Sequence, residues 1–330
     1  MVKNLVTGIG GFVASHLAAL LLEKGEEVYG TYRWNEDLSR INHIKEKIQL
    51  IPMDLNDSWS CLRAIEETKP DYIFHLAAQS YVSDSYIYPS ETIKTNTIGT
   101  LHLLEAVRVV RERDARVDPV IHVCSTSEVY GLVGREDVPI KETTRLNPSN
   151  PYAVGKVGTD MIALMYWTNY NLKTIRTRMF THTGPGRTMM SAECNFARQI
   201  ALIEQGNQPP IIKHGNLDSV RTWADVRDAV RAYYVLVRKC TVGDVYNIGG
   251  NVTKTIGEML DYLITLSPLK DAIKKQQDPK LMRPYDVSLQ IPDVSKFEKE
   301  TGWKPVYTFE QTMQDLLRWW RKEESGHASV

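Results

Sequence analysis

Four side chains that could move protons come from two short stretches of the chain. Thr126 and Glu128 stand two residues apart, and Tyr152 and Lys156 stand four residues apart further along. Residues two apart point to the same side of a strand, and residues four apart share one face of a helix. A nearby ammonium favours a phenolate, so we expect Lys156 to lower the pKa of Tyr152 and let it exchange a proton with a substrate hydroxyl.

The composition indicates a globular protein with no bias towards polyanions. Its 330 residues are 42% hydrophobic and 24% charged, which suits two lobes or one large α/β domain. Lysine plus arginine balance aspartate plus glutamate at 40 each, so nothing favours nucleic acid or an anionic membrane. No apolar run reaches the ~18 residues of a spanning helix, and we expect no signal peptide.

The cysteines give a prediction of location. Cys61, Cys124, Cys194 and Cys240 are widely scattered and form no CxxC pair. This pattern favours a reduced, cytoplasmic protein and gives no indication of a zinc site or any other metal site.

A glycine turn follows the first β-rich run, residues 2–7. Gly8, Gly10 and Gly11 precede an apolar helical stretch, and a second strand is expected at 27–31. Strand, glycine turn, helix and strand in this order are typical of dinucleotide binding, because backbone N–H groups can approach a pyrophosphate. The turn alone would also suit an ordinary loop.

The end of the second strand bears on the choice of cofactor. An NAD site requires a carboxylate for the ribose 2′-hydroxyl, whereas a 2′-phosphate requires cations. No acid occurs here before Glu36, and Arg33 can bind a phosphate and stack on adenine. We therefore predict NADP rather than NAD; the alternative is that Arg33 is a solvated surface charge.

Strand and helix patterns alternate along most of the chain. Further strands are expected at 48–53, 71–76, 120–124, 174–180, 211–214 and 244–248, with helices at 60–68, 92–113, 152–169, 195–204, 224–239 and 308–321. Residues 216–223 are expected to form a loop. The pattern predicts an α/β fold: a Rossmann-like doubly wound parallel sheet with a smaller C-terminal α/β substrate lobe. We expect residues 1–180, with part of 224–250, to bind NADP, and 181–330 mainly to bind substrate.

Several motifs together resemble the extended short-chain dehydrogenase/reductase family over nearly the whole chain. They are Thr7-Gly8-x-x-Gly11, Asp54, His75-Leu-Ala-Ala78, Asn96, Ser125-Thr126-Ser127-Glu128-x-Tyr130-Gly131, Tyr152-x-x-x-Lys156 and Arg283-Pro284. Within that family, the Ser125–Gly131 motif and residues 215–223 most resemble the GDP-mannose 4,6-dehydratases.

The resemblance implies a dehydration of GDP-mannose to GDP-4-keto-6-deoxymannose. Tyr152, with Thr126 on the same oxygen, would remove the C4 hydroxyl proton while hydride passes to NADP⁺. Glu128 would take the C5 proton and help expel water from C6, which then receives the hydride. The implied catalytic set is Thr126, Ser127, Glu128, Tyr152 and Lys156.

The chain also departs from those dehydratases. Residues 186–191 replace an arginine-rich segment, and Thr181 stands in place of a substrate-binding asparagine. Residues 183–186 and 195–204 look more like reductases of GDP-4-keto-6-deoxymannose, which share the Glu128 and Tyr152/Lys156 pattern. An NADPH-dependent reductase, a nucleotide-sugar epimerase and a non-catalytic NADP(H)-sensing protein are the alternatives.

The resemblance and the residue types give two sets of expected contacts. The cofactor contacts are Gly8, Gly11, Phe12, Val13, Arg33, Asp54, Leu55, Leu76, Ala77 and Ala78, with Tyr152 and Lys156. The contacts to a GDP-linked sugar are Ser80, Thr181, Arg187, Asn195, Lys213, Arg221 and Arg283. Arg221 and Arg283 could bind a diphosphate bidentately, although surface ion pairing would use them equally well.

The helices at 92–113 and 152–169 are apolar on more than one face. As the resemblance implies, their second faces could form a four-helix bundle with a partner, giving a homodimer or a tetramer. Full burial within one subunit would produce the same pattern.

Overall fold

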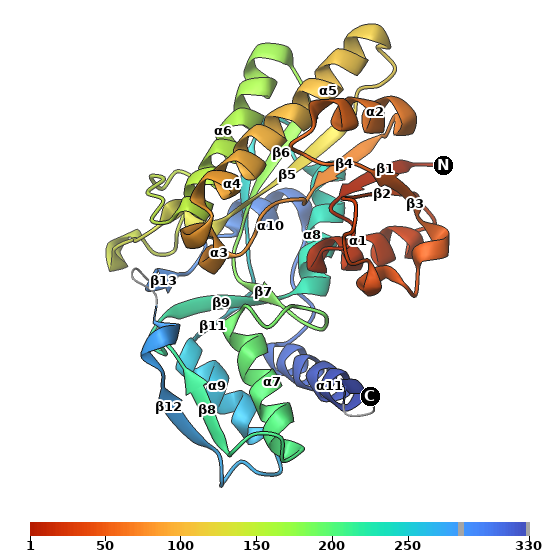
Figure 1. Ribbon diagram of the computed structural model, residues 1–330. Coiled ribbons are helices and arrows are strands. Elements are labelled where there is room, and N and C mark those ends of the chain that lie inside the picture. Colours follow the sequence, from red (N-terminus) through yellow and green to blue (C-terminus); the bar gives the residue numbers. More distant parts are fainter. Residues whose placement is uncertain (283–286, 328–330) are drawn as a thin grey trace.

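The computed structural model describes residues 1–282 and 287–327. In this part of the chain a seven-stranded sheet has the order β10-β6-β5-β4-β1-β2-β3, and each neighbouring pair is parallel (Figure 1). Its strands are β1 Lys3–Thr7, β2 Glu27–Tyr32, β3 Gln49–Pro52, β4 Tyr72–His75, β5 Val120–Thr126, β6 Thr174–Met179 and β10 Val245–Ile248. The predicted Rossmann-like sheet is confirmed.

Helices cover both faces of this sheet, which explains why most residues of its strands are buried. On one face, α1 (Phe12–Glu23) packs with α8 (Val226–Lys239) in a core that includes Leu17 and Tyr233. On the other face lie α2 (Ser58–Thr68), α5 (Gly99–Arg113) and α6 (Pro151–Tyr170). Three shorter elements precede α5: α3 Val82–Ile87, α4 Pro89–Ile93 and a π-helical turn, Lys94–Ile98. The predicted helix at 92–113 is therefore interrupted.

A smaller lobe lies beside the carboxyl ends of these strands (Figure 1). Its strands are β7 His182–Thr183, β8 Ile211–His214, β9 Val220–Asp225, β11 Val252–Thr255, β12 Lys274–Gln277 and β13 Leu289–Gln290. Its helices α7 (Ala192–Glu204), α9 (Ile256–Thr265) and α11 (Phe309–His327) enclose a separate core that contains Trp320. Helix α10, Ser295–Thr301, returns to the larger lobe and packs against β10.

The prediction of a loop at 216–223 holds for residues 216–219 and was wrong for residues 220–223. Strand β9 begins at Val220 and pairs with β7, β11 and β13, three segments that are not its neighbours in sequence. Helix α8 accordingly starts at Val226, where the Asp225 side chain accepts from the Arg227 N–H at 2.8 Å. Because the strand is stabilised by distant partners, the local residue pattern did not reveal it.

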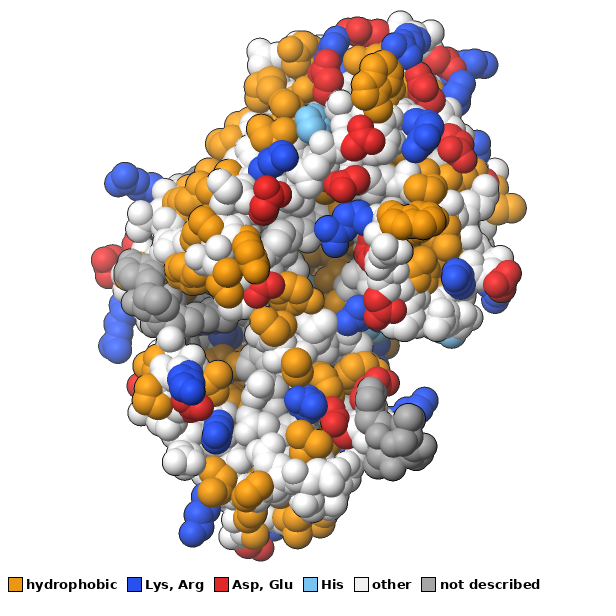
Figure 2. Space-filling view, in the orientation of Figure 1, with side chains coloured by type: hydrophobic (Ala, Val, Ile, Leu, Met, Phe, Trp, Pro, Cys, Tyr) orange, Lys and Arg blue, Asp and Glu red, His pale blue; other side chains and the backbone are white. Residues whose placement is uncertain are grey.

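No helix within residues 1–282 and 287–327 combines the length and apolarity required to cross a membrane. Figure 2 shows that the molecular surface is hollowed between the larger and the smaller lobe.

Candidate active site

The turn after β1 brings two strand ends close together at the carboxyl edge of the sheet. Gly8 has a φ of +69°, and a Cβ at this position would lie 3.0 Å from the Cα of Ala77. The hydroxyl oxygen of Thr7 accepts the N–H groups of Leu76 and Ala77, each at 3.0 Å. Gly8 therefore permits a close approach that any side chain would prevent.

Helix α1 begins directly after this turn. Gly11 is its N-cap, Phe12 and Val13 form its first turn, and among the described residues no side chain caps its N–H groups. An uncapped helix N-terminus carries a partial positive charge and is suited to bind a phosphate. These residues, with the close approach at Gly8, fit the pyrophosphate of a dinucleotide cofactor.

A cavity of about 470 Å³ lies beyond the ends of β2 and β3. Arg33, Trp34, Asp54 and Arg63 are among the residues that line it. Arg63 was missed by sequence reasoning, because an arginine in an amphipathic helix has no motif to distinguish it. The predicted contact Leu55 is buried and packs against Gly99.

The structure brings the four proton-transfer residues into one site. Thr126 ends β5, Glu128 lies in the following 3₁₀ turn, and Tyr152 and Lys156 belong to the first turns of α6. The Thr126 hydroxyl oxygen accepts the Glu128 N–H at 3.3 Å, and the same hydroxyl acts on the Tyr152 phenol by lowering its pKa. Lys156 Nζ donates to the Cys124 carbonyl at 2.8 Å, which ties α6 to β5.

Burial reverses the expected pKa shift of Tyr152. We predicted that Lys156 would lower it, but burial raises the pKa of Tyr152 above its usual value of 10.0. The Thr126 hydroxyl and the charge of Arg187 both lower this pKa, but by less than burial raises it. Burial also lowers the pKa of Lys156. The prediction was wrong because sequence spacing gives no measure of desolvation, which disfavours both charged forms.

Two amide side chains hold the Glu128 carboxylate. Gln290 Nε2 donates to Oε1 at 2.9 Å, and Asn150 Nδ2 donates to Oε2 at 3.2 Å. Ser127, the fifth predicted catalytic residue, donates its hydroxyl to Gln290 Oε1 at 3.1 Å. Sequence reasoning missed both amides. Asn150 precedes Pro151 at the start of α6, so its N-cap signal could have identified it; Gln290 carries no such signal.

The motif that carries Glu128 is anchored in the protein interior. The Tyr130 hydroxyl accepts from Arg178 Nη1 at 3.1 Å, and Arg178 Nε donates to the buried Asp160 of α6 at 2.8 Å. Gly131, with a φ of +60°, follows the 3₁₀ turn, and a Cβ there would lie 1.7 Å from the carbonyl oxygen of Asn147. The turn therefore requires glycine at this position.

The predicted substrate contacts are dispersed around the smaller lobe. Ser80 is exposed after β4, Thr181 lies between β6 and β7, Asn195 is on α7, Lys213 is exposed on β8, Arg221 is buried on β9, and Arg283 lies outside the described residues. Gln199 brings two of them together, since its Nε2 donates to Asn195 Oδ1 at 2.6 Å and to the Lys213 carbonyl at 3.0 Å.

Arg187 lies over the cofactor turn rather than with these contacts. The centre of its guanidinium is 5.6 Å from the centre of the Phe12 ring, and its Nε is 3.1 Å from Oε1 of the buried Glu193. Its charge also acts on Tyr152. Arg187, predicted as a substrate contact, is therefore placed beside the cofactor turn, from where its charge reaches Tyr152.

Two further residues missed by sequence reasoning hold the Arg187 loop in place. Arg40 Nε donates to the Gly186 carbonyl at 3.0 Å, and Arg40 Nη1 donates to the Gly10 carbonyl at 3.3 Å. His16 Nε2 donates to the Pro185 carbonyl at 2.9 Å. The loop is thus fixed against the glycine turn.

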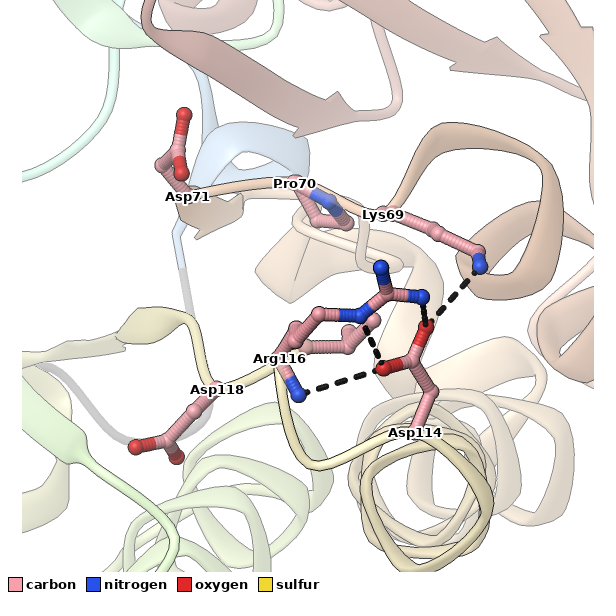
Figure 3. A pocket seen from close by; sticks show the side chains of 7 residues that line it. Lys69, Pro70, Asp71, Asp114, Arg116 and Asp118 are labelled. Carbon is pink, nitrogen blue, oxygen red and sulfur yellow. Dashed lines mark hydrogen bonds and ion pairs between the residues drawn. The ribbon is translucent and has the colours of Figure 1, made fainter.

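A second cavity, of about 400 Å³, lies at the amino ends of β4 and β5 (Figure 3). Asp114 there pairs with Lys69 at 3.1 Å and with Arg116 at 2.8 Å, and Figure 3 shows these side chains pointing toward one another. Ligands of doubly wound sheets bind at the carboxyl edge. We therefore assign the active site to the edge that carries Thr126 and Glu128.

A family model described as GDP-mannose 4,6 dehydratase matches residues 5–316 of this chain. The chain belongs to this family. A GDP-mannose 4,6-dehydratase of Yersinia enterocolitica is 32% identical to this family member, over 99% of this chain and 96% of the relative. A GDP-6-deoxy-D-mannose reductase of Pseudomonas aeruginosa is 30% identical, over 96% and 97% of the two chains.

Solved structures share the fold of this member of the GDP-mannose 4,6 dehydratase family over nearly its whole length. The structure of RMD from Pseudomonas aeruginosa complexed with NADPH has a TM-score of 0.81 and 28% identity, and covers 98% of this chain and 100% of that one. The dTDP-glucose 4,6-dehydratase of Bacillus anthracis in complex with NAD has a TM-score of 0.82 and 28% identity, and covers 98% of each chain. The resemblance to extended short-chain dehydrogenases/reductases is confirmed.

Proposed function

We propose that the protein is a nucleotide-sugar 4,6-dehydratase that converts GDP-mannose into GDP-4-keto-6-deoxymannose with NADP as its cofactor. The observation that carries this proposal is the arrangement of Thr126, Glu128 and Tyr152. The Thr126 hydroxyl and the Glu128 carboxylate both act on the pKa of the Tyr152 phenol, and two neutral amides hold that carboxylate in place. Dehydration requires these two proton-transfer groups, one for the C4 hydroxyl and one for C5–H.

The residues divide the reaction between them. A bound NADP would supply a positive charge and a hydride acceptor that later returns the hydride to C6. Tyr152, in its phenolate form, takes the proton of the C4 hydroxyl, with Thr126 and Arg187 opposing the effect of burial on its pKa. The resulting 4-keto group acidifies C5–H, and Glu128 removes that proton. Glu128 then protonates the departing C6 hydroxyl, so one water leaves. Once C6 has received the hydride, the proton held by Tyr152 replaces the one lost from C5, so the sugar shows no net redox change and Tyr152 is again a phenolate.

The reductase is the second candidate, favoured by the relative from Pseudomonas aeruginosa and by the short loop at 186–191. Incubation with GDP-mannose and catalytic NADP⁺, with the sugar nucleotide followed by mass, separates the two. Loss of one water without added reductant supports the dehydratase. Turnover of the 4-keto sugar alone, with stoichiometric NADPH, would overturn it in favour of the reductase.

Glu128→Gln tests the role of the carboxylate. We expect water loss to fall by about 10²–10⁴-fold, the range typical of a lost general base, while slow C4 oxidation remains. Glu136→Gln, on the exposed part of the following loop, is the matched control and should retain activity. Full activity in Glu128→Gln would show that another group takes the C5 proton.

The preference for NADP rests on the cavity between Arg33 and Arg63. Two guanidinium groups beside one cavity suit a 2′-phosphate. Three carboxylates line the same cavity: Asp54 and Asp57 follow β3, and Glu36 follows β2, where it accepts the Arg33 N–H at 2.9 Å. We propose that residues 1–180, with part of 224–250, form the cofactor domain and that 181–330 mainly bind the GDP-sugar.

We also propose a cytoplasmic homodimer. The cysteines, all within the described residues, are free thiols that a reducing compartment preserves.

The dimer is proposed from exposed apolar side chains. Helices α4 and α6 and the π-helical turn leave Ile93, Ile98, Val154 and Met161 exposed. A partner could cover these apolar side chains in a helical bundle. Sedimentation equilibrium tests the dimer, and a monomer at micromolar concentration would contradict it.

A further inference from the structure

The two amides that hold Glu128 come from opposite sides of the site. Asn150 belongs to the larger lobe and precedes α6, whereas Gln290 lies on β13 in the C-terminal part of the chain. Both are buried, at 7% and 3% exposure, while Glu128 itself is half-buried. The carboxylate is thus bonded by protein on both of its oxygens without being sealed from the site.

Each amide is fixed in one orientation by a second hydrogen bond. Ser127 Oγ donates to Gln290 Oε1 at 3.1 Å, which leaves Nε2 to face Glu128. The Asn150 Oδ1 accepts the Ala153 N–H at 2.8 Å, which leaves Nδ2 to face Glu128. A rotated amide would place its oxygen against a carboxylate oxygen, so these second bonds specify the donor side.

Strand β13 holds Gln290 between the two lobes. Gln290 pairs in register with Arg221 of β9, on the side of the smaller lobe. The next residue, Ile291, accepts the Ile140 N–H at 2.7 Å, and the Ile140 carbonyl accepts the Asp293 N–H at 2.8 Å. The strand is therefore anchored to the loop of the larger lobe as well as to β9.

We propose that Gln290 is a positioning residue that sets the orientation of the Glu128 carboxylate for proton removal at C5. The inference rests on the proposed function, because it assumes that Glu128 is the general base. Proton transfer requires the carboxylate oxygen to lie within hydrogen-bond reach of the proton that it takes. A neutral amide orients the carboxylate and leaves its charge intact, whereas a cation in the same place would form an ion pair with it.

Gln290→Leu tests the proposal, since leucine fills similar space without a donor. We expect C5–H exchange with deuterium oxide, measured on the sugar nucleotide, to slow by about 10–100-fold, the cost of a misplaced catalytic group. The rate of C4 oxidation and the KM for GDP-mannose should stay within twofold of the wild-type values, so a 4-keto hexose that retains its C6 hydroxyl accumulates. Exchange at the wild-type rate would overturn the proposal.

Ser127→Ala is the second test, because it removes only the bond that fixes the amide. We expect a smaller slowing of the same exchange step, and no further slowing when it is combined with Gln290→Leu, since both act on one interaction. If Gln290→Leu fails to fold, unchanged C5 exchange in Ser127→Ala overturns the proposal by itself.

Leu263→Ala controls for general destabilisation. Leu263 is fully buried in the core of the smaller lobe, and its truncation should lower the Tm while leaving the ratio of C5 exchange to C4 oxidation unchanged. A changed ratio in this control would assign the effect to lost stability and contradict the positioning role. Wild-type protein that releases no water from GDP-mannose contradicts the proposed function instead, so the two failures are distinguishable.

Discussion

The two edges of the central sheet hold their charged groups in opposite ways. At the amino edge, Asp114 pairs with Lys69 and Arg116, whose side chains are 49% and 86% exposed. At the carboxyl edge, Glu128 is bonded by two buried neutral amides, and Tyr152 and Lys156 are themselves buried.

This difference in the partners of the charged groups gives the two edges different capacities for proton transfer. Exposed ion pairs are screened by water and neutralise each other, so they contribute little and leave no group available for proton transfer. Buried groups held by neutral partners retain their capacity to gain or lose a proton, which is typical of functional sites. Pairing and burial, rather than the size of the cavity, distinguish the two edges.

Tyr152→Phe should have the largest effect on activity. Loss of the phenolic hydroxyl removes the group that, in the mechanism we propose, accepts the C4 hydroxyl proton, and we expect kcat to fall by about 10²–10⁴-fold. Tyr166→Phe on the same helix is a matched control, because the Tyr166 hydroxyl donates to Glu105 at 2.8 Å, away from the catalytic residues. Equal losses in the two variants would show that the effect is structural.

Acid should destabilise the protein through buried histidines of the sheet. Burial lowers the pKa of both His75 and His122 from 6.5 to about 3. Between these values the unfolded chain binds protons that the folded chain does not, so stability falls as the pH drops below 6.5. At about 1.4 kcal/mol per pH unit for each group, the two histidines together cost about 4 kcal/mol at pH 5.

Urea unfolding at pH 7 and pH 5 measures this loss. His122→Gln removes one of the two titrations and should reduce the pH-dependent difference by about 2 kcal/mol. The same difference in wild type and variant would contradict the assignment. The loss of stability in acid would then come from carboxylates such as Asp114. Arg116 holds the pKa of Asp114 below its usual range, so this carboxylate takes up its proton at lower pH than the histidines do.

Arg63→Ala should produce a smaller effect that is confined to the cofactor. Loss of one charge-assisted hydrogen bond to a 2′-phosphate, worth about 1.5 kcal/mol, should raise the KM for NADP⁺ by about tenfold. The KM for NAD⁺, which lacks that phosphate, serves as the internal control and should not change. An equal rise for both cofactors would exclude recognition of the 2′-phosphate by Arg63.

Arg116→Ala should have the smallest effect. Its partner Asp114 keeps Lys69, and both arginine and lysine lie in water at the amino edge. We expect kcat, KM and the urea midpoint of unfolding to match the wild-type values. A loss of activity would remove the distinction between the two edges.

Much of the fold was predictable because its signals are local. Alternating strands and helices predicted a doubly wound parallel sheet, and the glycine turn predicted the edge at which a cofactor binds. Strand β9 was missed because its partners lie at 182–183, 252–255 and 289–290, far from it in sequence. Gln290 was missed for the same reason, since its two hydrogen-bond partners are 162 and 163 residues away.

The sequence by itself determined which groups can react, because Thr126, Glu128, Tyr152 and Lys156 stand in short motifs whose spacing fixes their side of a strand or helix. Only the tertiary structure decided the pKa values of those groups and the hydrogen bonds that orient them. Burial raises the pKa of Tyr152 against the expected direction, and Gln290 reaches Glu128 from a distant strand. Desolvation and long-range hydrogen bonds depend on how the chain packs, and neither is a property of neighbouring residues.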